Sequence, residues 1–271
     1  MKSLFPKAVL ISIAMLATPS LAQGGFVTDR AAFQTACASI PLYSDNDGKV
    51  PSGKKTLSDK AKAGVNAIFD AWEKHGDGDR RKLAYVLATA FRESSYTFEP
   101  IKEVPSCEGD EGCIERAIGR LLAKRGKDPS ENYAAPDAHG KRYFGRGFVQ
   151  LTKRDNYVGM TKLLGIDLVK NPDLALEPET AATILVVGMR DGYFSPPRKL
   201  GAYFNDRSEE WVCARPIVNP GSANWGLMGQ HGKDILACLK PANGELAEVP
   251  PGLTHSLAQC ASVDPRNRRG R

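Results

Sequence analysis

The apolar residues of this chain recur mostly at the spacing of an α-helix. After Ser58, a residue type that can cap a helix, they fall at positions i, i+3, i+4 and i+7: Val65, Ile68, Phe69 and Trp72. That spacing places them on one face of a helix. The pattern stops at His75, which is followed by Gly-Asp-Gly. We therefore expect an amphipathic helix between about residues 58 and 75.

A second pattern of this kind covers residues 79–94, and its apolar stripe consists of Leu83, Val86, Leu87, Ala90 and Phe91. Shorter helices are expected at 28–37, 114–125, 155–164, 178–189, 208–214 and 233–239. Residues 41–56 are rich in Pro, Asp, Gly and Ser, which is typical of a loop. The sequence has no long alternating strand pattern, so it predicts a mainly α fold with at most a small β-hairpin.

The two ends of the chain differ from its middle. Residues 1–22 combine Lys2 and Lys7, a short apolar run and a final Ser-Leu-Ala, which is typical of a secretory signal peptide. A retained N-terminal anchor is the alternative. Residues 241–271 are Pro-rich and then basic, and we expect much of this tail to be mobile. We expect residues 23–240, between these two ends, to form one domain. We also expect the protein to be secreted or periplasmic and not stably inserted in a membrane.

All six cysteines follow the predicted signal peptide. An even number in an exported chain indicates disulfides. Cys107 and Cys113 close a short acidic loop and are expected to pair. We expect Cys213 to pair with Cys238 between neighbouring helices. The remaining pair, Cys37 and Cys260, would then connect the two ends of the chain. Structural zinc is disfavoured because Cys-x-x-Cys spacing is missing from the sequence and the four histidines are scattered.

Charge and motifs restrict the function class. The formal net charge is +6, which suits an anionic polymer such as a cell wall. The sequence has no basic helix interleaved with aromatic residues, so nucleic acid is not indicated. Gly-x-Ser-x-Gly and His-Glu-x-x-His are also missing, and Gly145-Arg146-Gly147 lacks the third glycine of a dinucleotide motif. We expect no cofactor and a monomer.

Glu93 is the first candidate catalytic residue. It shares a helix face with Val86 and Ala90, so it emerges from the end of the apolar stripe. The edge of apolar packing raises the pKa of a carboxyl group, which suits a general acid. The alternative is a helix-terminal glutamate that pairs with Arg92 or with a distant arginine.

Sugar hydrolysis requires a second carboxylate. The segment after Glu93 offers Glu99, Glu103, Glu108, Asp110, Glu111 and Glu115. Spacing alone does not choose among them.

Residues 143–157, YFGRGFVQLTKRDNY, are too polar for a core strand and too apolar for an ordinary loop. The two glycines let the backbone approach a sugar or turn tightly beneath it. Arg146, between them, either steadies a catalytic carboxylate or pairs within the fold.

Together with AFRESS (residues 90–95), this stretch resembles glycoside hydrolase family 19, the chitinases and related phage endolysins. GIDLVKNPDLAL (165–176) and IVNPGSANWG (217–226) are similar to later segments of that family. The likeness covers about residues 80–240. It implies an α+β, lysozyme-like fold: a helical, two-lobed domain with a substrate groove.

The resemblance also implies roles for individual residues. Glu93 matches the general acid. The endolysin branch has its general base about nine residues later, which favours Glu103, and the plant chitinases have theirs about twenty-two residues later, which would be Glu115. Thr152 matches a hydroxyl that helps to hold the attacking water. Three residues match positions that hydrogen-bond the sugar: Gln150, Asn156 and Asn219. Tyr143 and Tyr157 match positions that line the groove.

Three positions depart from the family pattern. Arg92 stands where the family has histidine before the acid. Pro220 is inserted in the 217–226 segment. The late arginine that steadies the acid is missing from its expected offset, where Lys233 is nearby.

The implied reaction is inverting hydrolysis of a β-1,4 link beside an N-acetylated sugar, in peptidoglycan or chitin. Two alternatives remain open. ESSYTFEP (93–100) is also similar to the helix end of lytic transglycosylases, which use one glutamate and release an anhydro-sugar. The departures above would also fit a cell-wall binding protein with a decayed site.

Overall fold

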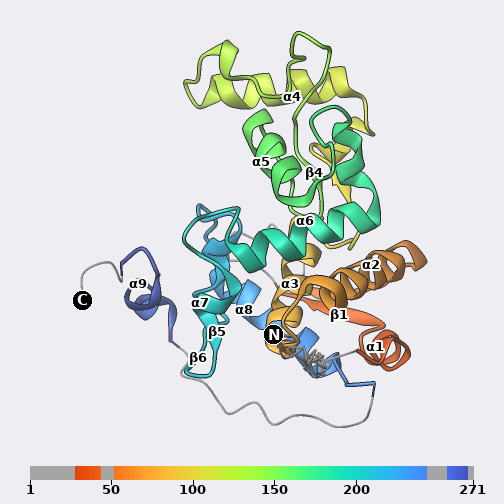
Figure 1. Ribbon diagram of the computed structural model, residues 1–271, viewed down its shortest axis with the longest axis vertical. Coiled ribbons are helices and arrows are strands. Elements are labelled where there is room, and N and C mark those ends of the chain that lie inside the picture. The colour runs from red at the N-terminus through yellow and green to blue at the C-terminus, as the bar shows by residue number, and fades with distance from the viewer. Residues whose placement is uncertain (1–27, 44–51, 243–254, 268–271) are drawn as a thin grey trace, which may run out of the picture.

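The computed structural model describes residues 28–43, 52–242 and 255–267. The predicted signal peptide therefore lies outside the described residues. The chain folds into two lobes, with α6 (Pro178–Asp191) at their junction (Figure 1). The lower lobe contains α1 (Arg30–Ala36), α2 (Asp59–His75), α3 (Arg80–Glu93), α7 (Leu200–Tyr203) and α8 (Trp225–Cys238). The upper lobe contains α4 (Glu111–Lys124) and α5 (Arg154–Leu164).

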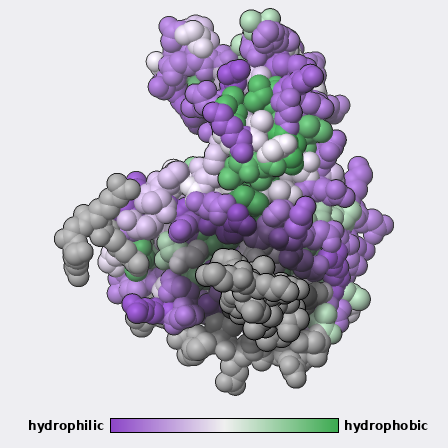
Figure 2. Space-filling model, in the orientation of Figure 1, coloured by the Kyte–Doolittle hydropathy of each residue, from purple (hydrophilic) through white to green (hydrophobic). Residues whose placement is uncertain are grey.

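The described strands form three short antiparallel pairs. They are β1 (Ser39–Leu42) with β2 (Gly53–Thr56), β3 (Ile101–Lys102) with β4 (Arg146–Gly147), and β5 (Phe204–Asn205) with β6 (Ser208–Glu209). The mainly helical class is confirmed, although the sequence allowed for only one hairpin. Polar residues cover most of the face in Figure 2, and the molecule narrows where the lobes meet.

Helix α3 is the centre of the lower lobe. Every residue from Leu83 to Phe91 is buried, so α3 is enclosed by other elements and not amphipathic in the ordinary sense. It packs against α8, while α2 packs against α6. The predicted cap of α2 is confirmed, since the Ser58 hydroxyl oxygen accepts a hydrogen bond from the Ala61 amide at 3.1 Å. The end of α3 is therefore a rigid platform for Glu93.

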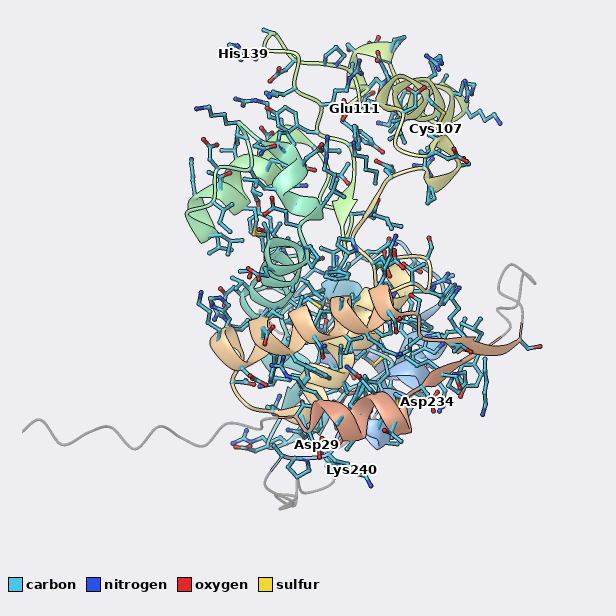
Figure 3. All side chains as sticks on the ribbon, turned by 90° about the vertical axis from the view of Figure 1, so that its right-hand side faces the viewer. Asp29, Cys107, Glu111, His139, Asp234 and Lys240 are labelled. Carbon is cyan, nitrogen blue, oxygen red and sulfur yellow. A yellow bond between two sulfur atoms is a disulfide. The ribbon has the colours of Figure 1, made fainter. Side chains whose placement is uncertain are left out.

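Two of the three expected disulfides are wrong. Cys107 pairs with Cys113 as predicted, but Cys37 pairs with Cys238 and Cys213 pairs with Cys260. The reason is the path of the chain: the Asp29 amide donates to the Lys240 carbonyl at 2.9 Å, which brings the start of α1 beside the end of α8 (Figure 3). Neighbouring positions in space therefore lie far apart in sequence.

The C-terminal segment has a second attachment besides the Cys213–Cys260 disulfide. Arg198 donates to Asp264 at 2.8 Å, and both side chains are almost completely buried. Burial opposes the ionisation of Asp264, but hydrogen bonds from Arg266 and Arg198 outweigh it and lower the pKa of Asp264 to about 2. Residues 255–267, including α9 (Cys260–Val263), are thus attached to the rest of the fold, and the expectation that much of the tail is mobile stays a prediction. The domain boundary at residue 240 stays a prediction.

Two other local predictions are wrong. Residues 208–214 form β6 and a turn instead of a helix, because Trp211 and Glu210 are both buried and do not leave one face to solvent. Helix α8 begins at Trp225, well before the expected residue 233. Glycines stand where the helical pattern would have apolar residues: a Cβ on Gly232 would lie 2.7 Å from the Trp211 ring, and one on Gly229 would lie 3.2 Å from the Trp211 backbone.

Candidate active site

Glu93 is the last residue of α3, and a buried arginine holds its carboxylate. The Arg215 guanidinium donates to Glu93 Oε1 at 2.6 Å. The Arg215 side chain is 2% exposed and that of Glu93 is 14% exposed. The Glu93 carboxylate is therefore mostly enclosed by protein and directly paired with a buried cation.

Arg215 is itself fixed by two further hydrogen bonds. Its Nε donates to Asn224 Oδ1 at 3.0 Å, and its Nη1 donates to the Val218 carbonyl at 2.7 Å. The family-like pattern led us to expect an arginine near Lys233, after the 217–226 segment. The arginine that holds the acid is instead Arg215, which lies just before that segment. Lys233, the nearby cation in sequence, is exposed on α8.

The Glu93 carboxylate lines a pocket of about 280 Å³, whose walls are Arg92, Glu93, Ser95, Tyr96, Arg215, Asn219, Ser222 and Asn224. Most of these side chains carry hydrogen-bonding groups, as a sugar ligand requires. Asn219 lies here in a left-handed backbone conformation, with a φ of 58°. Asn219 and Glu93 thus line the same pocket, and the sugar-binding role of Asn219 stays a prediction.

The loop after Glu93 holds several side chains in strained backbone conformations. Ser95, Tyr96 and Phe98 have φ values of 56°, 65° and 55°. The Ser94 hydroxyl oxygen accepts from the Phe98 amide at 2.9 Å, and the Phe98 ring is fully buried against Phe91. Such strain persists only where the surrounding structure enforces it, and it concentrates at functional sites.

Glu103 follows β3 and is held by neutral donors. The Tyr133 hydroxyl donates to Glu103 Oε1 at 2.8 Å, and the Gly145 amide donates to Glu103 Oε2 at 2.8 Å. The Glu103 amide donates in turn to the Gly145 carbonyl at 2.7 Å. This geometry fixes the carboxylate relative to residues 143–157.

The glycines of that stretch are needed for turning and close approach. A Cβ on Gly145 would lie 2.7 Å from Gln150 Oε1 and 3.2 Å from Glu103 Oε2, and Gly147 has a φ of 84°. Larger residues would displace Glu103 or the turn. Of the two explanations offered by the sequence, the tight turn is the one that the described contacts support.

Sequence comparisons identify the family. The sequence profile of class I chitinases, glycoside hydrolase family 19, matches residues 42–187. The chain belongs to this family. Endochitinase 2 of Gossypium hirsutum is 32% identical over 136 residues, which cover 49% of this chain and 43% of that protein. Chitinase 2 of Oryza sativa subsp. japonica is 34% identical over 148 residues, which cover 52% of this chain and 40% of that protein.

This family 19 chain therefore spans less than half of the length of these curated relatives. Among solved structures, chitinase C from Streptomyces griseus HUT6037 is similar with a TM-score of 0.47 and 19% identity, over 82% of this chain and 80% of that chain. The family membership expected from the 143–157 stretch is thus confirmed by the profile.

The predicted polar wall of this family 19 chain is a connected set of hydrogen bonds. Gln150 Nε2 donates to the carbonyls of Ile101 and Gly147, at 3.0 and 3.1 Å. The Thr152 hydroxyl donates to the Gln150 carbonyl at 2.5 Å, and Asn156 Nδ2 donates to the Thr152 carbonyl at 2.6 Å. The described contacts use both amide hydrogens of Gln150 and the hydroxyl hydrogen of Thr152, so their side-chain oxygens remain for a ligand, while Asn156 keeps its oxygen and one amide hydrogen.

Tyr143 and Tyr157 do not line a groove as expected. Tyr157 is 0% exposed and its hydroxyl donates to the Phe144 carbonyl at 3.0 Å, while Tyr143 is 3% exposed. Desolvation raises the pKa of Tyr157 to about 12, so it stays neutral. The two rings pack edge to face and support the wall from behind.

Arg146 also has a structural role. Its Nε donates to Asp173 at 2.6 Å, and its guanidinium lies over the Phe144 ring at 3.8 Å from the centroid. The expectation that it pairs within the fold is the one that agrees with these contacts.

Glu115, the alternative base, lies in a different environment. It is on α4, in the outer part of the upper lobe, and forms an ion pair with Arg142. Glu111 lies on the same helix near the top of Figure 3. Of the two candidate bases, only Glu103 receives hydrogen bonds from the 143–157 stretch among the described contacts.

Sequence reasoning missed Arg215, Tyr133, Ser222 and Asn224. Ser222 and Asn224 were inside a quoted family-like segment, so that segment was a usable signal. The sequence raised a distant arginine as an alternative partner of Glu93, but nothing identified it as Arg215, which is 122 positions away. Tyr133 had no signal, because Glu103 is 30 positions away.

Within the part of the chain that the structure describes, no group of three or more His, Cys, Asp or Glu side chains could hold a metal ion. Likewise, none of the described helices is both long and apolar enough to cross a bilayer.

Proposed function

We propose that this chain hydrolyses β-1,4 links beside N-acetylglucosamine in chitin or peptidoglycan, with inversion of configuration. The observation that carries the proposal is Glu93, a mostly buried carboxylate at the end of a buried helix, which is held by Arg215 and lines a polar pocket. Membership of the class I chitinase family supports the reaction type.

Glu93 is the proposed general acid, which gives its proton to the leaving glycosidic oxygen. Once the proton has left, the carboxylate faces the permanently charged Arg215 at 2.6 Å. The ion pair therefore stabilises the state that follows proton transfer, which lowers the barrier to the chemical step.

Glu103 is the proposed general base, with Thr152 as the residue that helps to hold the water. An inverting mechanism leaves room for a water between the carboxyl groups, which lie about 6.5–9.5 Å apart in such enzymes. Gln150, Asn156 and Asn219 are proposed to contact the sugar through their amide groups.

Chitin is the substrate that the named relatives favour, because they are endochitinases and chitinases. Peptidoglycan has the same β-1,4 links and stays in the proposal. The three disulfides are typical of a protein exported to an oxidising compartment, so we propose a secreted or periplasmic protein.

The direct test is Glu93→Gln, assayed by the release of reducing ends from colloidal chitin and, in parallel, from purified peptidoglycan. We expect kcat to fall by about 10²–10⁴ on whichever polymer is the substrate, because general acid catalysis is worth that much. Glutamine keeps an oxygen for Arg215, so the thermal unfolding midpoint should change little. Glu99→Gln, on the same loop, is the control and should leave kcat unchanged. A folded Glu93→Gln protein with normal activity would contradict the proposal.

Product analysis distinguishes the other functions. Mass spectrometry should show products whose mass includes one added water for each cleaved link. NMR taken early in the reaction should show the α-anomer at the new reducing end. Products that lack one water would indicate a transglycosylase. Binding to either polymer without any product would indicate a binding protein.

A further inference from the structure

Both oxygens of the Glu103 carboxylate receive a hydrogen bond from a neutral donor. One donor is the Gly145 amide, which belongs to the backbone and cannot be varied without moving the turn. The other is the Tyr133 hydroxyl, the only side-chain donor to Glu103 among the described contacts. Because each carboxylate oxygen has two lone pairs, one on each oxygen stays available for a water.

Tyr133 is itself held firmly. Its ring packs against the small core of the upper lobe, which is formed by Cys107, Ile114, Ile118, Ala134 and Phe144. The residues on either side of it are tied down: Asn132 Nδ2 donates to the Glu115 carbonyl at 3.2 Å, and the Ala134 carbonyl accepts from Arg142 at 2.9 Å. The hydroxyl therefore has a fixed position with respect to α4 and the disulfide loop.

Tyr133 also keeps its proton. Desolvation first, and then the charge of Glu103 and the hydrogen bond to it, raise the pKa of Tyr133. The hydroxyl therefore acts on Glu103 as a neutral hydrogen-bond donor, which can orient the carboxylate without placing a charge beside it.

We propose that Tyr133 is a positioning residue, whose hydroxyl fixes the orientation of the base Glu103 and keeps it ready to accept a proton from water. This inference rests on the proposed function of Glu103. Tyr133 does not touch the reacting atoms in this role; it acts only through the carboxylate. The upper-lobe core and the Cys107–Cys113 loop would thereby determine the catalytic rate from a distance.

The test is a double-mutant cycle of Tyr133→Phe and Glu103→Ala, measured as kcat and KM on the soluble hexamer of N-acetylglucosamine. Phenylalanine removes only the hydroxyl. A hydrogen bond to a charged group is worth about 1.5–3 kcal/mol, so we expect kcat of Tyr133→Phe to fall roughly 10–100-fold, with KM within about twofold. In the Glu103→Ala background, Tyr133→Phe should change kcat by less than about twofold, because the group through which it acts is gone.

Tyr43→Phe is the matched control. The Tyr43 hydroxyl also donates to a carboxylate at 2.8 Å, that of Asp234, and neither residue lines the Glu93 pocket or has a described hydrogen bond to Glu103. It should leave kcat unchanged, and the thermal unfolding of each variant shows whether it is folded.

The outcomes separate the two proposals. If Glu103→Ala keeps normal activity, the assignment of Glu103 as base is wrong and the inference falls with it. If Glu103→Ala is inactive but Tyr133→Phe has normal kcat, or lowers kcat equally in both backgrounds, the role of Tyr133 alone is wrong.

Discussion

The two candidate catalytic carboxylates are held in opposite ways. Glu93 ends a buried helix and faces a cation that is 2% exposed. Glu103 lies in a loop and receives hydrogen bonds from an amide and a phenol, both neutral. Glu93 is supported by the lower lobe and by the 215–224 segment, whereas every described partner of Glu103 belongs to the upper lobe or its connection.

This difference matches the tasks proposed for the two groups. An acid becomes negatively charged during the reaction, so a permanent cation beside it stabilises the developing charge. A base loses its charge when it takes a proton, so a cation at the same distance would oppose the transfer. Neutral donors can orient such a base without strongly opposing the proton transfer.

The largest expected effect concerns the identity of the base. Glu103→Gln should lower kcat by about 10²–10⁴, while Glu115→Gln should change it less than about threefold. The reason is that Glu115 pairs with Arg142 on α4 and has no described contact with residues 143–157. Initial rates on colloidal chitin for both variants provide the measurement. If Glu115→Gln lowered kcat more than Glu103→Gln, the general base would be Glu115 and the assignment of Glu103 would be wrong.

The next effect distinguishes a charged support from a neutral one. Arg215→Met leaves the mostly buried Glu93 carboxylate without its partner, which should reduce the free energy of unfolding by about 3–5 kcal/mol in urea titrations. Lys62→Met is the control, because the Lys62–Asp59 pair is exposed and such pairs contribute about 0–1 kcal/mol. Equal, small losses in both variants would show that Arg215 does not support Glu93 as described.

The loop that joins the two carboxylates depends on one contact in the lower lobe. A Cβ on Gly64 of α2 would lie 1.9 Å from the Phe98 carbonyl oxygen. Gly64→Ala should therefore push the loop away, cost about 3 kcal/mol of unfolding free energy and lower kcat as well. Gly226→Ala meets open space on α8 and should not be destabilising. An unchanged melting temperature for Gly64→Ala would argue against this close approach.

The smallest effect uses a third carboxylate that has no proposed part in catalysis. The pKa of Asp264 is about 2 in the fold, below the ordinary value of 3.8. Its contribution, about 2 kcal/mol, is therefore present above pH 4 and lost as the pH falls from about 4 to 2. Urea titrations across that range should show the loss. Asp264→Asn should be less stable at pH 7 and lack this part of the pH dependence; identical pH profiles for the two proteins would contradict the role of the arginines.

Much of the fold could be predicted from the sequence because helix signals are local. The apolar spacing after Ser58, the capping hydroxyl itself and the stripe that leads to Glu93 each involve residues within about two turns of one another. Where glycines replaced the apolar positions, as in α8, the same reasoning placed the start of the helix too late.

The candidate site was predictable only in part. Glu93, Glu103 and the Gln150–Asn156 wall came from residue type and family resemblance, and the structure gives them the contacts described above. Their roles stay proposals. The groove-lining role of Tyr143 and Tyr157 was wrong, because an amphipathic side chain in a polar motif looks the same whether its ring faces a ligand or the core.

The sequence by itself determined the helical class, the position of Glu93 at a helix end and the turn around Gly145 and Gly147, since each depends on neighbours along the chain. Only the tertiary structure decided which cysteines pair, which arginine holds the acid and which hydroxyl holds the base. Cys37 and Cys238 are 201 positions apart, and Arg215 and Glu93 are 122 apart. Contacts over such distances follow from the packing of whole helices, which no local pattern of residues encodes.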